Sequence, residues 1–348
     1  MDIDKKSIRR RALELIAADG HRVGTRLAQA AGLSRQGANG YLQALVRDGL
    51  VEAEGPTRAR VYRLKTLVEV AGQYKREGLQ EDIVWRELVS PVVADLPENV
   101  RNIWHHASTE MINNAIDHSG AKEVQVQIRR TALHTDILVA DDGVGIFVKI
   151  QRALDLHDPR ESILELAKGK LTTAPEQHSG EGIFFTSRGV DLFEIDSHHL
   201  RFMHAPRSDD AIVEQATDTP GTRVFMRLAN ESPRLMRDVF NAFMDPEEFT
   251  FDKTVVPLRL AQYAGEQLVS RSQAKRVANR FERFSRVELD FAGISEIGQA
   301  FADEMFRVFQ ASHPAIRITS INTEPAVAQM IRRVVATGAA RNGTGQPS

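Results

Sequence analysis

Helical periodicity is clearest between residues 97 and 120. The apolar positions recur every three or four residues: Val100, Ile103, Trp104, Ala107, Met111, Ile112, Ala115 and Ile116. This spacing predicts a helix with one buried stripe. Pro97 stands near its expected start, and Gly120 stands where a helix C-cap is expected.

The N-terminal pattern predicts three helices, at 7–18, 25–31 and 35–48, and then two strands around a turn at 55–58. Ser34 is a good N-cap for the third helix. Three helices followed by a hairpin resemble a winged helix-turn-helix, which we assign to residues 1–66. If this domain binds DNA, Arg35, Gln36, Asn39 and Tyr41 face the major groove, and Arg58 and Arg60 meet phosphates from the wing. A winged helix used for protein contacts is the alternative.

The remaining pattern predicts a helical linker at 67–90, a central domain at 91–230 and an α/β domain at 250–337. Central strands are expected at 135–140, 192–195, 200–203, 212–213 and 223–226, in a mixed sheet with helices on one face. In the C-terminal domain, strands at 253–256, 287–291 and 316–321 alternate with helices at 265–284, 301–309 and 326–335. The polar tail at 338–348 is expected to be disordered.

Charge divides the chain unevenly. Up to Leu67 there are 13 Lys and Arg against 7 Asp and Glu, a net of +6, so the overall −2 leaves −8 for the remainder. A basic segment ahead of an acidic body suggests a nucleic-acid-binding module. There are no cysteines, no apolar signal core and no apolar run long enough to span a bilayer. We therefore expect a cytoplasmic protein without membrane contact.

Candidate chemistry begins on the 97–120 helix. Glu110 and Asn114 are four residues apart and share a face, with Asp117 about one turn further on. Carboxylate and amide oxygens suit a hard cation such as Mg²⁺. A solvated polar face is the plain alternative.

A second motif follows the strand at 135–140. Asp141 at the strand end can accept a hydrogen bond from an exocyclic amine such as that of adenine. Gly143 and Gly145 let the backbone approach a ligand closely. An ordinary turn explains Asp-Gly-x-Gly alone equally well, but the two motifs in this order are far more specific.

Together the motifs resemble the GHKL ATPases, the superfamily of DNA gyrase B, histidine kinases and MutL. The form Glu-x-x-Asn-Asn-Ala-x-x-His-Ser at 110–119 is most similar to the anti-sigma-factor serine kinase branch. The resemblance implies an α/β sandwich that binds ATP and Mg²⁺. The implied site residues are Glu110 acting on the attacking nucleophile, Asn114 on Mg²⁺, Asp117 in the same site, Asp141 on adenine, Gly143 and Gly145 shaping the pocket, Gly180 and Gly182 at the phosphates, and Thr222 at the base.

The same resemblance implies a mobile lid at about 150–178. Two departures stand out: Asp142 occupies a position where many members have Asn, and the lid contains few glycines.

The C-terminal domain resembles STAS domains, and more closely a STAS-like domain of unknown function found after such ATPases. The carrying residues lie at 269–274, 289–291 and 298–304. STAS antagonists have a phosphorylatable Ser where this chain has Gly298-Gln299-Ala300, so phosphorylation in the usual way is not expected.

These assignments favour a DNA-binding regulator whose Mg-ATP module controls the flanking domains by slow hydrolysis. An anti-sigma-type serine/threonine protein kinase is the alternative, and a nucleotide sensor without turnover is the second. The expected partners are DNA, an unidentified protein at the STAS-like domain and a second copy in a homodimer.

Overall fold

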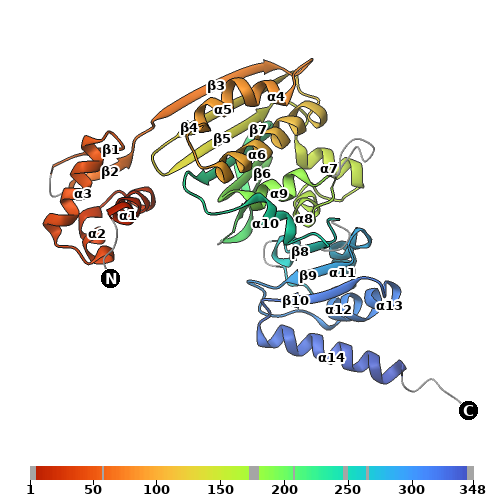
Figure 1. Ribbon diagram of the computed structural model, residues 1–348. Helices are drawn as coiled ribbons and strands as arrows, with labels where there is room; N and C mark the ends of the chain where they lie inside the picture. Colours follow the sequence, from red (N-terminus) through yellow and green to blue (C-terminus); the bar gives the residue numbers. More distant parts are fainter. Residues whose placement is uncertain are drawn as a thin grey trace, which may run out of the picture.

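The computed structural model describes residues 5–56, 59–171, 180–206, 208–245, 250–263 and 266–342. It has mixed α/β architecture with sheets of two, three and five strands. The chain passes from a small N-terminal unit, through a central unit built on the five-stranded sheet, to a C-terminal unit built on the three-stranded sheet (Figure 1).

The N-terminal unit contains three helices and a hairpin, as the periodicity predicts. Its elements are α1 (Lys5–Ala18), α2 (Val23–Ala31), α3 (Arg35–Arg47), β1 (Val51–Glu54) and β2 (Val61–Leu64). The two strands pair antiparallel. Ser34 accepts a hydrogen bond from the Gly37 amide at 3.1 Å, so the expected N-cap is confirmed.

The central sheet has the order β3-β4-β5-β7-β6. Its strands are β3 (Val68–Lys75), β4 (Glu123–Arg130), β5 (His134–Asp141), β6 (Leu192–Ala205) and β7 (Ser208–Ala229). Every described strand pairing in this sheet is antiparallel, so the prediction of a mixed sheet is wrong. The four short strands expected after residue 190 form two long ones.

One face of the central sheet is covered. Along β4, Val124, Val126 and Ile128 are buried while the alternate residues are exposed. Helix α6 (Glu98–His118) packs on the buried face, as expected from its apolar stripe. The other helices of this unit are α4 (Glu81–Val84), a π-helical turn (Trp85–Val89), α5 (Ser90–Val93), α7 (Ile146–Leu154), α8 (Glu161–Lys168), α9 (Gly182–Gly189) and α10 (Met236–Asn241).

The segment 67–90 is not a helical linker. Its first part is β3, which pairs with β4 from Val68 opposite Arg130 to Lys75 opposite Glu123. Val68, Val70 and Tyr74 alternate with more exposed residues along this strand. A period of two therefore governs the segment, and the central unit begins some twenty residues earlier than the predicted boundary at 91.

The C-terminal unit is a parallel three-stranded sheet with the order β10-β9-β8. Its elements are β8 (Lys253–Pro257), a 3-10 turn (Leu258–Ala261), α11 (Arg271–Ala278), a 3-10 turn (Phe281–Arg283), β9 (Arg286–Asp290), α12 (Gln299–Asp303), a π-helical stretch (Glu304–Phe309), α13 (Gln310–Ser312), β10 (Arg317–Ile321) and α14 (Pro325–Asn342).

Two predicted helices of this unit differ from the structure. The helix expected over 265–284 is shorter, because Asn279 leaves the helix and Arg280 adopts a φ of 66°. Helix α14 continues to Asn342, so residues 338–342 are helical rather than disordered. The rest of the tail lies outside the described residues.

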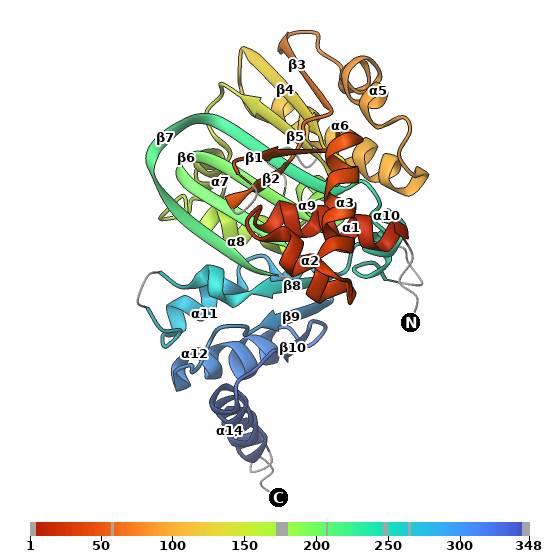
Figure 2. The same cartoon turned by 90° about the vertical axis from the view of Figure 1, so that its left-hand side faces the viewer.

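The central and C-terminal units share one hydrophobic core. Buried residues of both, among them Phe185 on α9, Phe251 and Leu289 on β9, belong to a single cluster. The N-terminal unit has its own core, against which Ala132 and Leu133 of the β4–β5 turn pack. Figure 2 shows the long β6–β7 hairpin curving toward the three-stranded sheet.

Candidate functional site

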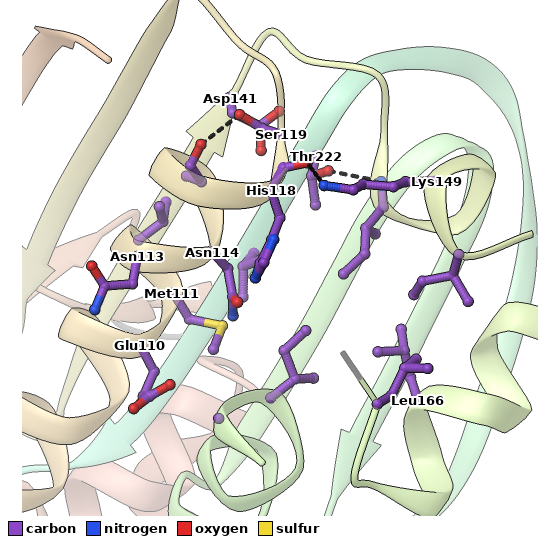
Figure 3. A pocket seen from close by; sticks show the side chains of 18 of the residues that line it. Glu110, Met111, Asn113, Asn114, His118, Ser119, Asp141, Lys149, Leu166 and Thr222 are labelled. Carbon is purple, nitrogen blue, oxygen red and sulfur yellow. Dashed lines mark hydrogen bonds between the residues drawn. The ribbon is translucent and has the colours of Figure 1, made fainter. Parts of the chain in front are cut away.

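A pocket of about 320 Å³ lies between α6, α7, α8 and the start of α9. This volume is typical of small-molecule sites. Seven of the predicted site residues line it: Glu110, Asn114, Asp141, Gly145, Gly180, Gly182 and Thr222. Figure 3 shows Asp141 and Thr222 toward one end of the pocket and Glu110 toward the other, with Asn114 between them. The motifs that the sequence separates therefore meet in one cavity.

Helix α6 supplies one wall. Glu110, Asn114 and His118 are spaced by four residues and all line the pocket. The buried Asn114 amide nitrogen has no hydrogen-bond partner among the described residues. Because an unpaired buried amide is costly, this side chain is poised for a ligand. An amide oxygen and a carboxylate on one face fit the oxygen ligands that Mg²⁺ prefers.

Gly182 brings the start of α9 against Glu110. A Cβ added at Gly182 would lie 2.0 Å from the Glu110 Oε2 atom. No larger residue fits without moving the carboxylate. The helix start and the acid are thereby held together at one end of the pocket, where backbone amides favour an anion.

Asp141 ends β5 and lies opposite Thr222 of β7. Its carboxylate accepts a hydrogen bond from the Gly143 amide at 2.9 Å. Burial raises its pKa to about 6, and the hydrogen bonds from Gly143 and Thr222 act in the opposite direction. The Thr222 hydroxyl accepts from the Ile146 amide at 3.0 Å, which ties the start of α7 to β7.

Two glycines allow close backbone contacts around Asp141. Gly221 has a φ of 70°, and an added Cβ would lie 2.0 Å from the Asp141 carbonyl oxygen. Gly143 lies beside the end of α6, where a Cβ would be 2.2 Å from the Ser119 carbonyl oxygen. Gly143 therefore shapes the pocket from behind and does not line it.

Asp117 and Asp142 also lie outside the pocket lining. Asp117 is exposed on α6 and interacts electrostatically with Lys149. Asp142 is exposed and accepts hydrogen bonds from the Lys122 and Glu123 amides at 2.8 and 3.1 Å. These bonds lower the Asp142 pKa and fix the start of β4, so this residue has a structural role.

Lys149 is a pocket residue that the sequence analysis missed. Its Nζ donates to the His118 carbonyl oxygen at 2.5 Å, across the cavity from α7 to α6 (Figure 3). Burial lowers its pKa, and Asp117 opposes this effect. The sequence could have indicated this residue, because Lys149 lies one turn after Gly145 on the helix that follows the glycine motif.

Helix α8 separates the pocket from the C-terminal unit. The resemblance implied a mobile lid in this region, yet the residues of α8 from Ser162 to Lys168 are all buried. Leu166 lines the pocket. Lys168 Nζ donates to Glu165 Oε1 at 2.7 Å and to the Asn279 carbonyl oxygen at 2.8 Å, and Arg280 pairs with Glu165 Oε2 at 3.0 Å.

Other contacts reinforce this junction. The Thr254 hydroxyl of β8 donates to the Lys168 carbonyl oxygen at 2.7 Å. Burial lowers the Lys168 pKa, and Glu165 opposes this effect. Helix α8 thus belongs to both the pocket and the junction between units: Leu166 lines the pocket, and the charged side chains of Glu165 and Lys168 contact the C-terminal unit.

The predicted lid and phosphate segment is only partly visible. Residues 172–179, including Ser179, lie outside the described residues. On either side of them, the Leu171 amide donates to the Gly180 carbonyl oxygen at 3.0 Å. Gly180 has a φ of 72°, a conformation that favours glycine.

Only some of the residues predicted to contact DNA lie together on one exposed surface. Arg35, Gln36 and Asn39 are exposed on α3. Tyr41 is half-buried and packs against the core of the N-terminal unit, so it does not share their face. Arg60 is half-buried beside β2. Arg58 lies outside the described residues.

Comparison with known proteins identifies one segment. Residues 273–328 match the STAS-like domain of unknown function (DUF4325). The chain therefore carries a C-terminal STAS-like domain; the matched residues include β9 and β10, and β8 precedes them in the same sheet. A search of curated proteins gives no match. Within the described ranges, no helix is both long and apolar enough to cross a membrane.

Proposed function

We propose that the chain is a Mg-ATP-binding regulator, in which a GHKL-type central unit controls a DNA-binding winged helix and the STAS-like domain. The convergence of Glu110, Asn114, Asp141 and Thr222 on one pocket carries this proposal. These residues come from two separate motifs and a distant strand, and no simple structural role requires all four in one cavity.

The proposal assigns polar groups of the pocket to the adenine, the triphosphate and its Mg²⁺. The Asp141 carboxylate would accept a hydrogen bond from the adenine amine, with Thr222 beside it on the neighbouring strand. The triphosphate would extend toward the start of α9 and Lys149. Asn114 would hold Mg²⁺, which when bound neutralises phosphate charge. Glu110 would orient the attacking nucleophile and accept its proton.

Helix α8 supports coupling to the STAS-like domain. A nucleotide in the pocket would contact Leu166 of α8, the helix that also carries Glu165 and Lys168. Because these charges are paired within a shared core, a shift of α8 requires the junction with Arg280 to rearrange. The proposal therefore places the nucleotide signal in this helix.

The DNA-binding part is supported by the exposed Arg35, Gln36 and Asn39 on a helix ahead of a hairpin. The N-terminal unit contacts the central unit through Leu133 and through the Lys6–Glu231 ion pair at 3.0 Å. Gel-shift titrations with and without Mg-ATP test this link. Unchanged DNA affinity would remove the coupling from the proposal.

Turnover assays separate the alternatives. Phosphate released from ATP by the wild type, and lost in Glu110→Gln with binding retained, supports hydrolysis. Labelled γ-phosphate on a protein instead supports the anti-sigma-type kinase, and binding without either product supports the sensor. Glu98→Gln, at an exposed position on the same helix, is the matched control.

A further inference from the structure

A second cleft, of about 340 Å³, lies between the central unit and the STAS-like unit. It shares no lining residue with the nucleotide pocket. Its polar lining is Arg188, His204 and Asp210 from the central unit, and Arg259 and Asp290 from the STAS-like unit. The volume suits a small metabolite.

The cleft lies at the carboxyl edge of the parallel sheet. Pro257 and Asp290 are paired residues at the ends of β8 and β9, and both line the cleft. Open α/β sheets bind ligands in crevices beyond the carboxyl ends of their strands. The curved β6–β7 hairpin reaches this edge, so residues of the central unit form the opposite side (Figure 2).

Both walls carry fixed charges. On the central side, Asp210 is buried and its Oδ1 lies 2.5 Å from His204 Nδ1. The Arg188 guanidinium carbon lies 3.5 Å from the Phe184 ring centroid and 5.3 Å from that of Phe243. Burial lowers the Arg188 pKa to about 10, so the side chain stays charged at neutral pH.

The STAS-like side carries a second carboxylate. Asp290 Oδ1 accepts from the Ala292 amide and from Asn322 Nδ2, both at 2.9 Å, which fixes its orientation. Arg259 is exposed at the same edge. The cleft therefore presents guanidinium and carboxylate groups from both units. Apolar residues complete the lining: Ala205, Pro206, Phe243, Val255, Pro257 and Ala292.

We propose that this cleft binds a free α-amino acid with an apolar side chain. The ligand carboxylate pairs with the arginines, the ammonium group pairs with the aspartates, and the side chain contacts Phe243 and Val255. A simple anion such as phosphate would face the carboxylates of Asp210 and Asp290 as well as the arginines. A ligand with both charges satisfies both sets of groups.

Isothermal titration of the full chain with L-leucine, L-valine, L-methionine and L-phenylalanine tests the proposal. At least one should bind saturably. For leucine, 4-methylpentanoate lacks the ammonium group and isopentylamine lacks the carboxylate; each should bind at least about tenfold more weakly. The corresponding deaminated and decarboxylated analogues serve for any other amino acid that binds.

Variants assign binding to the cleft. Asp290→Asn retains the side-chain oxygen that accepts from Ala292, and Arg259→Gln changes an exposed residue, so neither should alter the far-UV circular dichroism spectrum. Each should weaken binding by at least about tenfold, while Glu296→Gln, exposed elsewhere on the same unit, should not. Absence of binding by all four amino acids, binding of inorganic phosphate in their place, or unchanged affinity in both cleft variants would overturn the proposal.

Discussion

Protonation of Asp141 gives the most quantitative prediction. Burial raises the pKa of this carboxyl from an ordinary value of 3.8 to about 6. That difference corresponds to about 3 kcal/mol. Because the folded protein holds this proton more tightly than the unfolded chain, the proton stabilises the fold at low pH. This contribution is fully present below about pH 4 and is lost as the pH rises through about 6.

Nucleotide binding should show the opposite dependence. In the proposed complex, the adenine amine donates a hydrogen bond to the ionised carboxylate. With a pKa of about 6, about a tenth of Asp141 is ionised at pH 5 and about nine tenths at pH 7. Affinity for Mg-ADP should therefore be roughly tenfold weaker at pH 5 than at pH 7. The wild type should therefore gain nucleotide affinity over the same pH range in which the free protein should lose stability.

The Asp141→Asn variant, which lacks this titrating group, is the reference for the pH dependence of both stability and nucleotide affinity. Urea unfolding of the nucleotide-free proteins from pH 4 to pH 7 should show the wild type losing stability relative to the variant, by up to about 3 kcal/mol. Calorimetric titrations with Mg-ADP should show a pH dependence in the wild type beyond that of the variant, since titration of the phosphate is common to both. Parallel pH profiles in the two proteins would refute the reasoning.

Three further perturbations test separate parts of the structure. Glu165→Gln should destabilise the chain by about 3–5 kcal/mol in urea unfolding, because it leaves Lys168 and Arg280 buried without their carboxylate. Gly182→Ala should slow phosphate release from ATP in the turnover assay, because its Cβ would displace the Glu110 carboxylate that is proposed to orient the nucleophile. Arg35→Ala should weaken DNA binding in gel shifts by about 1–3 kcal/mol and relax the sequence preference, because this residue is expected to read the major groove.

Each perturbation has a matched control at an exposed position. Glu69→Gln on β3 tests whether loss of any carboxylate is destabilising, and Arg237→Ala on α10 tests whether loss of any arginine weakens DNA binding. Gly40→Ala is the control for Gly182→Ala, because a Cβ added at Gly40 meets no atom within 4 Å. An effect in a control as large as in its partner variant would remove the specific explanation.

The sequence predicted elements whose periodicity and end signals agree. Helix α6 combines an apolar stripe with Pro97 and Gly120 at its ends, and Ser34 marks the start of α3. The candidate site was predicted from motifs on such elements, because Glu110 and Asn114 lie on one face of a helix whatever the rest of the fold. The resemblance then connected these residues with Asp141 and Thr222.

The failures have physical causes. Strand β3 contains Val70 and Tyr74 at a spacing that also fits a helix, and only its pairing with β4 decides between the two. The burial of α8 depends on Glu165 and Lys168 neutralising each other beneath a second unit, whereas charged residues in a sequence usually indicate exposure. The interior position of Lys149 depends in the same way on packing between helices.

Equilibrium binding of Mg-ATP to the full chain and to Asn114→Ala is the most direct test of the central claim. The account predicts saturable binding by the wild type and its loss in the variant, with both proteins unfolding at similar urea concentrations. Absence of binding by the wild type, or equal affinity in the two proteins, would contradict the assignment of this pocket to a magnesium-bound nucleotide.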